Sequence, residues 1–322
     1  MMQIRKKHML LLFLCAGLLS GCGNSQQEKM EKELESSVED TGIVFTDDLG
    51  YVVNLDTPLR TAVLSGSYAE SWLLAGGELA AVTEDAKEVI EVTEAIVDLG
   101  EVKHPSVETM LAADIDFVIL SSAIATHVEL RDTLETAGIA TAYFEVETFA
   151  DYKEMMQIFT AITGREDLYE ENVAQVEQRI NEQIARAESA LANESNPTVL
   201  FLRAFSTGVK AKGSDSMTGQ MLKDLGCVNI ADSDDSLLED ISMEAIIAAD
   251  PDYIFVTTMG ASEEAGLAMV DELLANNPAW SGLSAIENGH YVVLPQDLFH
   301  NKPNNRWDES YRILADEIYG EE

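Results

Sequence analysis

The residues best suited to chemistry in this sequence are three cations that lie close together in the stretch RAFSTGVKAK. They are Arg203, Lys210 and Lys212. The chain has a formal net charge of −38, and residues 198–322 contain only seven Lys or Arg residues. Guanidinium and ammonium groups bind carboxylate and phosphate oxygens through charge-assisted hydrogen bonds. A cationic cluster in so acidic a chain predicts a site for an anionic group, with ordinary loop lysines as the alternative.

Aromatic side chains near the ends of predicted strands could cover a flat or bulky ligand. Tyr68 and Trp72 follow the strand predicted at 60–65, and Phe205 follows the strand predicted at 198–204. Such rings stack on extended ligands and bury a large area. Trp72 also has helical spacing with the leucines that follow it, which is equally typical of a core residue.

Several other kinds of site lack the residues that they need. A zinc or manganese site requires convergent His and carboxylate ligands, whereas the histidines beyond the N-terminal segment are scattered at His104, His127, His290 and His300. The sequence has no Gly-x-Ser-x-Gly elbow, no Walker loop and no Gly-x-Gly-x-x-Gly turn. The acidic composition repels nucleic acid. We therefore expect no catalytic residues, no resident metal or cofactor, and no nucleic-acid partner.

The N-terminus has the features of a secreted lipoprotein. A basic start is followed by an apolar run at 9–19 that is too short to span a bilayer. The run ends in LSGC at 19–22, which resembles the bacterial lipobox, whose cysteine is lipidated. An ordinary signal peptide with a chance cysteine is the alternative. We expect a signal peptide at 1–21, a lipid on Cys22 and a flexible polar tether at 22–42.

Strand-like and helix-like runs alternate from residue 43 onwards, which is typical of βαβ units around a parallel sheet. Residues 165–194 interrupt the alternation, because they contain no Gly or Pro and their apolar residues recur at helical spacing. They predict one long helix of roughly 40 Å, with two helices and an unmarked break as the alternative. We predict an α/β fold of two lobes, each with a mostly parallel sheet flanked by helices, and a ligand cleft between the lobes. The predicted parts are an N-terminal lobe at 43–163, a connecting helix at 164–194 and a C-terminal lobe at 195–322.

One unit of the sequence occurs twice, 136 positions apart. SVETMLAADIDFVILSS begins at Ser106, and SMEAIIAADPDYIFVTT begins at Ser242. Each copy predicts a short helix followed by a buried strand. The serine is expected to cap the helix, and the glutamate in the first turn, Glu108 or Glu244, suits the helix dipole.

With its lipobox, its lobe–helix–lobe order and its paired Ser-x-Glu … Asp-x-Asp units, the chain resembles the solute-binding lipoproteins of ABC importers for siderophores, haem and cobalamin. The resemblance implies a monomeric, non-enzymatic carrier, anchored to the outer face of the cell membrane by lipid alone. It implies capture of an iron complex, a ferric siderophore or haem, and delivery to a permease dimer with its ATPase. One glutamate per lobe docks onto permease arginines in that family, which assigns this role to Glu108 and Glu244.

The ligand should lie against loops at the carboxyl ends of the strands, as in other open α/β sheets. The candidate ligand-binding residues in or near these loops are Tyr68, Trp72, His127, Arg203, Phe205, Lys210, Lys212, Met217 and His300. Four of them can ligate haem iron, namely Tyr68, His127, Met217 and His300. A cobalamin or corrinoid carrier of the same fold is the alternative. An enzyme or a structural surface lipoprotein on the same scaffold is the alternative from another class.

Overall fold

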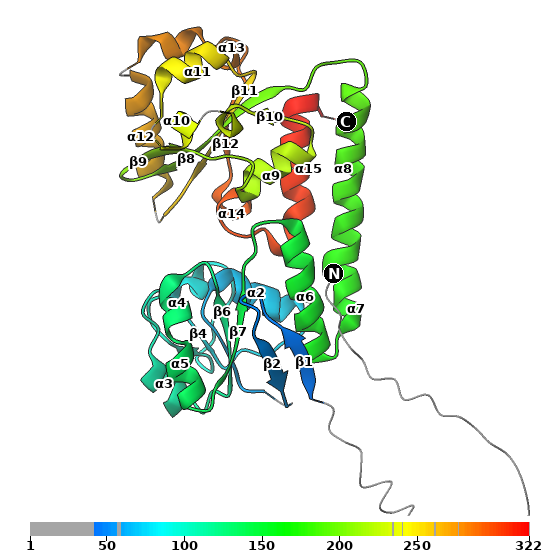
Figure 1. Cartoon of the computed structure of the whole chain (residues 1–322), viewed down its shortest axis with the longest axis vertical. Helices are drawn as coiled ribbons and strands as arrows, with labels where there is room; N and C mark the ends of the chain where they lie inside the picture. Colours follow the sequence, from blue (N-terminus) through cyan, green and yellow to red (C-terminus); the bar gives the residue numbers. More distant parts are fainter. Residues whose placement is uncertain are drawn as a thin grey trace, which may run out of the picture.

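The computed structural model describes residues 42–56, 59–233, 235–239, 241–260, 262–275 and 277–321. Two α/β lobes follow one another along the long axis of the molecule, and helices join them along one side (Figure 1). The predicted fold class is therefore confirmed. The predicted signal peptide, Cys22 and nearly all of the predicted tether lie outside the described residues.

The first lobe contains a five-stranded parallel sheet in the order β5-β4-β3-β6-β7. Its strands are β3 (Thr61–Val63), β4 (Ala81–Val82), β5 (Val97–Asp98), β6 (Phe117–Ser121) and β7 (Ala140–Phe144). β6 and β7 are buried along almost their whole length, as expected of parallel strands with helices on both faces. The two-residue strands β4 and β5 were not predicted, because so short a run has no periodicity.

A hairpin precedes this sheet and helices surround it. The antiparallel strands β1 (Ile43–Thr46) and β2 (Val52–Leu55) form the hairpin. The buried carboxylate of Asp47 stabilises its turn by accepting hydrogen bonds from the N–H groups of Leu49 (3.1 Å) and Tyr51 (2.8 Å). The helices of this lobe are α2 (Gly66–Leu74), η1 (Glu84–Glu88), α3 (Val107–Ala112), α4 (Ala125–Glu129), α5 (Arg131–Thr136) and α6 (Phe149–Thr163).

One helical run connects the lobes, as predicted. It consists of α7 (Glu166–Tyr169), the π-helical turn η2 (Glu170–Ala174) and α8 (Gln175–Leu191). The sequence did not predict the π turn. Asn172 lies in this turn and donates a hydrogen bond to the carbonyl oxygen of Leu74 at 3.0 Å, which ties the turn to the end of α2.

The second lobe contains parallel strands in the order β10-β8-β11-β12, with β9 antiparallel to β8. The strands are β8 (Thr198–Phe205), β9 (Gly208–Ala211), β10 (Val228–Asn229), β11 (Tyr253–Thr258) and β12 (Tyr291–Leu294). The cationic stretch expected to be a loop is therefore mainly a β-hairpin. Gly208 at its turn has a φ of +154°.

The helices of the second lobe return the chain to the connecting helix. They are α9 (Met217–Asp224), η3 (Ile230–Asp232), α10 (Asp235–Glu239), α11 (Met243–Ala249), α12 (Glu263–Ala275), η4 (Pro278–Gly282), α13 (Ser284–Glu287), α14 (Gln296–Phe299), η5 (Asn304–Arg306) and α15 (Trp307–Tyr319). α15 lies beside α8 (Figure 1), and Arg186 and Asp316 form an ion pair of 2.7 Å between them.

The segment between α14 and α15 also contacts the first lobe. Asn304 is 1% exposed and has a φ of +53°. Its side chain accepts a hydrogen bond from the hydroxyl of Ser71 (2.9 Å) and donates one to the carbonyl oxygen of Ser67 (3.0 Å), both in α2. Phe149 of α6 packs edge-on against Trp307 of α15, with ring centroids 5.9 Å apart. A continuous apolar core therefore passes between the lobes on the side of the connecting helix.

Candidate ligand-binding site

The cations predicted to bind an anion lie on one face of the second sheet. Arg203, near the end of β8, is the antiparallel partner of Lys210 in β9. Cross-strand partners point to the same face, and alternation along β8 brings Phe205 to that face as well. The structure thus brings together Arg203, Phe205 and Lys210, and Lys212 follows β9 directly. The charge of Glu147 in the first lobe acts on Arg203.

Two buried nitrogens belong to this surface, which we call the cationic wall. Nε of Arg203 and Nδ1 of His300, which follows α14, have no hydrogen-bond partner within the described part of the chain. Both side chains are otherwise partly exposed. Buried polar atoms are nearly always hydrogen-bonded, and leaving one without a partner costs free energy. Nε of Arg203 and Nδ1 of His300 are therefore hydrogen-bonding atoms that the described residues leave unused.

The charges in this wall act on one another. Burial lowers the pKa of His300, and the nearby positive charges of Arg203 and Lys302 lower it further. The imidazole therefore stays neutral at neutral pH, with one nitrogen lone pair and one N–H available. Burial also lowers the pKa of Arg203, and the negative charge of Glu147 acts in the opposite direction. Arginine keeps its charge in proteins, so the wall remains cationic.

The facing wall, in the first lobe, is acidic. A cavity of about 280 Å³ is lined by Asp48, Glu145, Glu147, Asp151 and Glu154. Burial raises the pKa of Asp48, and the charges of Asp151, Asp47 and Glu154 add to the rise, although a hydrogen bond from the N–H of Glu145 opposes it.

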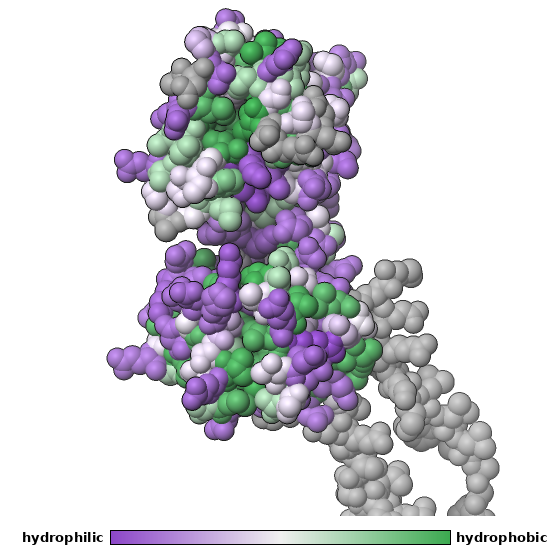
Figure 2. Space-filling view, turned by 60° about the vertical axis from the view of Figure 1, so that its left-hand side comes forward, coloured by the Kyte–Doolittle hydropathy of each residue, from purple (hydrophilic) through white to green (hydrophobic). Residues whose placement is uncertain are grey.

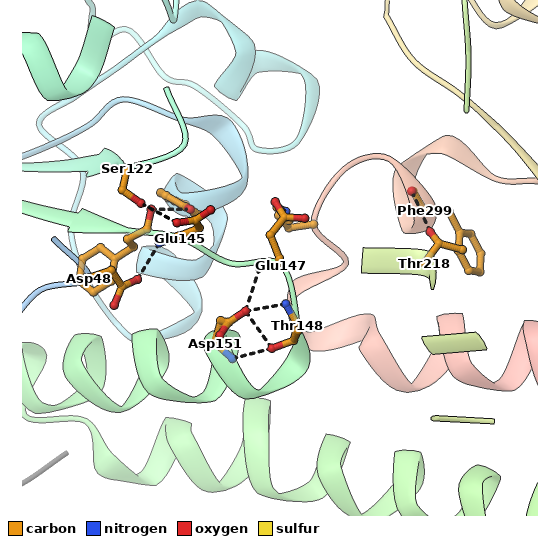
Figure 3. Close-up of polar contacts among 11 residues, drawn as sticks. Asp48, Ser122, Glu145, Glu147, Thr148, Asp151, Thr218 and Phe299 are labelled. Atoms are coloured by element: carbon orange, nitrogen blue, oxygen red, sulfur yellow. Dashed lines mark hydrogen bonds and ion pairs between the residues drawn. The ribbon is translucent and has the colours of Figure 1, made fainter. Parts of the chain in front are cut away.

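Two of these carboxylates hold the loop between β7 and α6 in place. Asp48 accepts a hydrogen bond from the N–H of Glu145 at 2.7 Å. Asp151 accepts bonds from the N–H groups of Glu147 (3.0 Å) and Thr148 (2.7 Å) and completes a capping box with Thr148. Glu147 lies between these contacts and the second lobe (Figure 3).

An ion pair joins the acidic wall to the cationic wall. Nζ of Lys302, after α14, lies 2.9 Å from Oε1 of Glu147, before α6. In the space-filling view the molecule narrows between the lobes, and hydrophilic residues border the hollow there (Figure 2). The cleft therefore has opposite charges on its two sides, and Glu147 is an internal counter-ion of the cationic wall.

Four predicted ligand-binding residues lie in the core instead. Tyr68 is 4% exposed and donates its hydroxyl proton to the carbonyl oxygen of Phe144 at 3.0 Å. Trp72 is buried, and its indole N–H donates to the carbonyl oxygen of Glu78 at 3.0 Å. Met217, the first residue of α9, is 2% exposed.

His127 is the fourth of these, and both of its ring nitrogens are occupied. Its Nδ1 accepts a hydrogen bond from the N–H of Ser121 at 3.1 Å, and its Nε2 lies 2.8 Å from the carbonyl oxygen of Val102. Burial lowers the pKa of His127. The neutral ring thus joins three segments of the first lobe, which leaves no nitrogen for a ligand.

The carboxylates of the acidic wall were not among the predicted site residues. The signal was present, since Glu145, Glu147 and Asp151 follow the strand that ends at Phe144. In a chain with 58 acidic residues, however, three more carboxylates do not stand out. Their function depends on the cations opposite, which come from a segment about 155 residues later.

The duplicated unit has the same local structure in both lobes. Ser106 caps α3 by accepting a hydrogen bond from the N–H of Thr109 (3.1 Å), and Ser242 caps α11 through Ala245 (3.3 Å). The cap residues have nearly identical backbone angles, φ −79° and ψ 104° or 102°.

The aspartates that follow each helix also correspond. Asp114 and Asp250 have φ angles of +51° and +42°. Asp116 and Asp252 each accept a hydrogen bond of 2.7 Å from the N–H at the start of the neighbouring strand, at Arg60 and Thr198. The unit therefore fixes one helix to one strand in the same orientation in each lobe. Glu108 and Glu244 are exposed and have no partner among the residues described.

Two further features are absent from the described residues. None of their helices is both long and apolar enough to cross a membrane. No group of three or more His, Cys, Asp or Glu side chains in the same part of the chain is arranged to hold a metal ion. Cys227 is buried, and burial raises the pKa of its thiol to about 12.

Solved structures share this fold at low sequence identity. IsdE of Staphylococcus aureus, complexed with heme, has a TM-score of 0.68 at 16% identity, over 82% of this chain and 100% of its own. SirA of S. aureus, complexed with staphyloferrin B, has a TM-score of 0.67 at 15% identity, and the match covers 86% of this chain and 97% of SirA. The siderophore-binding protein BauB, bound to acinetobactin and ferric iron, has a TM-score of 0.67 at 20% identity, and the match covers 87% of this chain and 98% of BauB.

Comparison of the sequence itself gives the family. No curated protein matches the chain. A family profile described as "Periplasmic binding protein" matches residues 61–298, which run from the first strand of the first sheet to α14. Because this match covers most of the sequence, the chain belongs to the periplasmic binding protein family, whose members are binding proteins that act outside the cytoplasm.

Proposed function

We propose that this protein is the solute receptor of an ABC importer and that it captures a ferric siderophore with anionic groups. The observation that carries the proposal is the cationic wall of the cleft, where Arg203 and His300 have buried nitrogens without a partner among the described residues. Lys210 and Lys302 extend the same positive surface. The iron is cargo, and no resident cofactor is part of the proposal.

The cleft favours a polar iron complex over haem. Tyr68 and Trp72, the first-lobe aromatics that could stack on a flat ligand, are both buried in the core. The residues that line the cleft wall there are carboxylates instead. Haem needs a large apolar contact surface for its macrocycle, whereas carboxylate groups of a siderophore suit Arg203 and the lysines.

The structural relatives support an iron-containing ligand. BauB is bound to a siderophore complex with ferric iron, and IsdE is complexed with heme. Both share the two-lobed fold with this chain. If haem is the ligand instead, His300 is the histidine that could serve as an axial ligand of the iron, because both nitrogens of His127 are bonded within the protein.

Delivery to a permease and a lipid anchor complete the proposal. Glu108 and Glu244, exposed at equivalent positions of the two lobes, would contact cationic residues of a permease dimer. A lipid on Cys22 would hold the receptor at the outer face of the membrane. Cys22→Ala should abolish labelling by a fatty acid, and a variant that is still labelled and membrane-bound would exclude this anchor.

A binding screen tests the ligand. The protein from residue 23 onwards is titrated with ferric carboxylate, hydroxamate and catecholate siderophores, with haemin and with cobalamin, while absorption and tryptophan fluorescence are recorded. We expect saturable binding of an anionic ferric siderophore. A shifted Soret band with haemin would show that the ligand is haem, and binding of cobalamin alone would show that it is a corrinoid. A cationic ligand would contradict the role of Arg203.

A further inference from the structure

Each copy of the duplicated unit exposes one aliphatic side chain beside its glutamate. Leu111 on α3 is 48% exposed, and Ile247 on α11 is 43% exposed. The two residues occupy the same position in the unit, three residues after Glu108 and Glu244 respectively. Residues three apart are neighbours on a helix surface. Each helix therefore presents a carboxylate next to an aliphatic group.

The rest of each helix supports this orientation. Met110 and Ile246, one residue before the exposed aliphatics, are both fully buried and attach the helix to its lobe. Ala112 and Ala248, one residue after them, are exposed again. The pattern of a carboxylate, an aliphatic group and an alanine on the outer face is thus the same in the two lobes.

Exposed aliphatic residues are common on protein surfaces and carry little meaning singly. Val52 is 73% exposed and Val228 is 51% exposed, for example, and neither belongs to the duplicated unit. Leu111 and Ile247 differ because they recur at one position of a repeated structure whose helix caps and strand contacts also recur. The repetition indicates a partner that presents the same surface twice.

We infer that Leu111 and Ile247 are docking residues for the permease. With Glu108, Glu244 and the neighbouring alanines they form two docking stripes, one in each lobe. This inference rests on the proposed function, in which the two glutamates contact a two-fold permease. It adds the chemistry of the partner, which must offer a cation beside an apolar patch at two symmetric positions.

Electrostatics explains why the aliphatic group matters. An ion pair that stays in water contributes little, because solvent and salt screen it. An apolar side chain that packs beside the pair excludes water and lowers the local dielectric, which strengthens the attraction. A second copy of this chain would bring carboxylates against carboxylates and is a poor occupant. Since α3 and α11 lie toward opposite ends of the molecule (Figure 1), the partner must span both lobes.

Photocrosslinking in the source cells tests the identity of the occupant. The full-length protein carries p-benzoylphenylalanine in place of Leu111, Ile247 or Val228, and adducts are identified by mass spectrometry. We expect adducts with an ABC permease subunit from the positions of Leu111 and Ile247, and none from the position of Val228. Absence of permease adducts, or adducts with a second copy of this chain, would overturn the inference.

A functional assay separates this inference from the proposed function. The variants Leu111→Gln and Ile247→Gln, singly and together, are compared with Val228→Gln for stimulation of the permease–ATPase complex in nanodiscs. Glutamine keeps helix propensity and size but removes the apolar surface. We expect the double variant to need about tenfold more protein for half-maximal stimulation, with unchanged thermal unfolding and affinity for the ligand.

Two results would contradict the stripes in different ways. If the double variant behaves like Val228→Gln while a Glu108→Lys and Glu244→Lys double variant loses stimulation, the aliphatic residues have no docking role and the proposed function stands. If the Glu108→Lys and Glu244→Lys double variant also stimulates the complex fully, neither the glutamates nor the aliphatic residues dock, and the docking role that the proposed function assigns to the duplicated unit is wrong.

Discussion

Lys302 and Glu147 form an ion pair of 2.9 Å that joins the second lobe to the first across the ligand cleft. The side chains are 21% and 44% exposed, so solvent screens the pair and its contribution to folding is modest. The pair has a larger effect on the site. Glu147 neutralises part of the positive charge on the wall that contains Arg203 and His300, and the anionic ligand that we propose would compete with it.

Replacement of Glu147 should strengthen the binding of an anion. In Glu147→Gln the ligand no longer competes with a carboxylate for Lys302, and we expect a gain of about 0.5–1 kcal/mol, the range of a partly solvated ion pair. Titration calorimetry with the ferric siderophore found by the screen measures it. Glu154→Gln is the control, because Glu154 lines the same cavity without an ion pair to a described residue. Equal gains in both variants would assign the effect to net charge alone.

Replacement of Arg203 should weaken binding of the same ligand. Arg203→Met keeps much of the side-chain volume but removes a charge-assisted donor, which we expect to cost about 1.5–3 kcal/mol. The matched control is Lys223→Met, which removes one positive charge from the exposed surface of α9. If both variants bind like the wild type, the anion is held elsewhere, and the cationic wall is not the ligand site.

His300 should make the folding stability depend on pH. Its pKa in the folded protein lies below the ordinary value of 6.5, chiefly because of burial. The unfolded chain therefore binds more protons as the pH falls below 6.5, so the stability contributed by the neutral ring is present above that value and is lost below it. His127 acts in the same direction.

Urea unfolding between about pH 7.5 and 5.5 measures this contribution. His300→Gln should show a shallower loss of unfolding free energy on acidification than the wild type, since one of the two histidines no longer titrates. Circular dichroism at the higher pH checks that the variant is folded. Parallel pH profiles of the two proteins would show that His300 is not a titrating group of the native state.

The position of Trp72 in the core makes Gly77 sensitive to substitution. A Cβ at Gly77 would overlap the indole ring of Trp72, whereas a Cβ at Gly282 would meet no atom within 4 Å. We expect Gly77→Ala to destabilise the protein by about 1–3 kcal/mol through overpacking, and Gly282→Ala to change stability by less than about 0.5 kcal/mol. Denaturant unfolding compares the two. A stable Gly77→Ala variant would show that Trp72 can move away from the core.

Local signals in the sequence were sufficient for the architecture. Alternating strand and helix patterns, the uninterrupted helical run after residue 164 and the repeated unit each depend on residues close together in the chain, because periodicity and helix caps act over one or a few turns. They predicted two lobes, one long connecting helix and the caps at Ser106 and Ser242, all of which the structure contains. Arg203 also followed from a local pattern, since it lies near the end of an apolar strand.

The tertiary structure decided which of the predicted polar and aromatic residues are occupied within the core and which keep polar atoms without a partner among the described residues. His127 and His300 are equivalent as sequence features, but the nitrogens of His127 meet Ser121 and Val102, whereas Nδ1 of His300 has no partner among the described residues. The pair between Glu147 and Lys302 connects residues far apart in the chain and appears in no local pattern. Burial and charge pairing depend on how distant segments pack together, and periodicity along the chain does not contain that information.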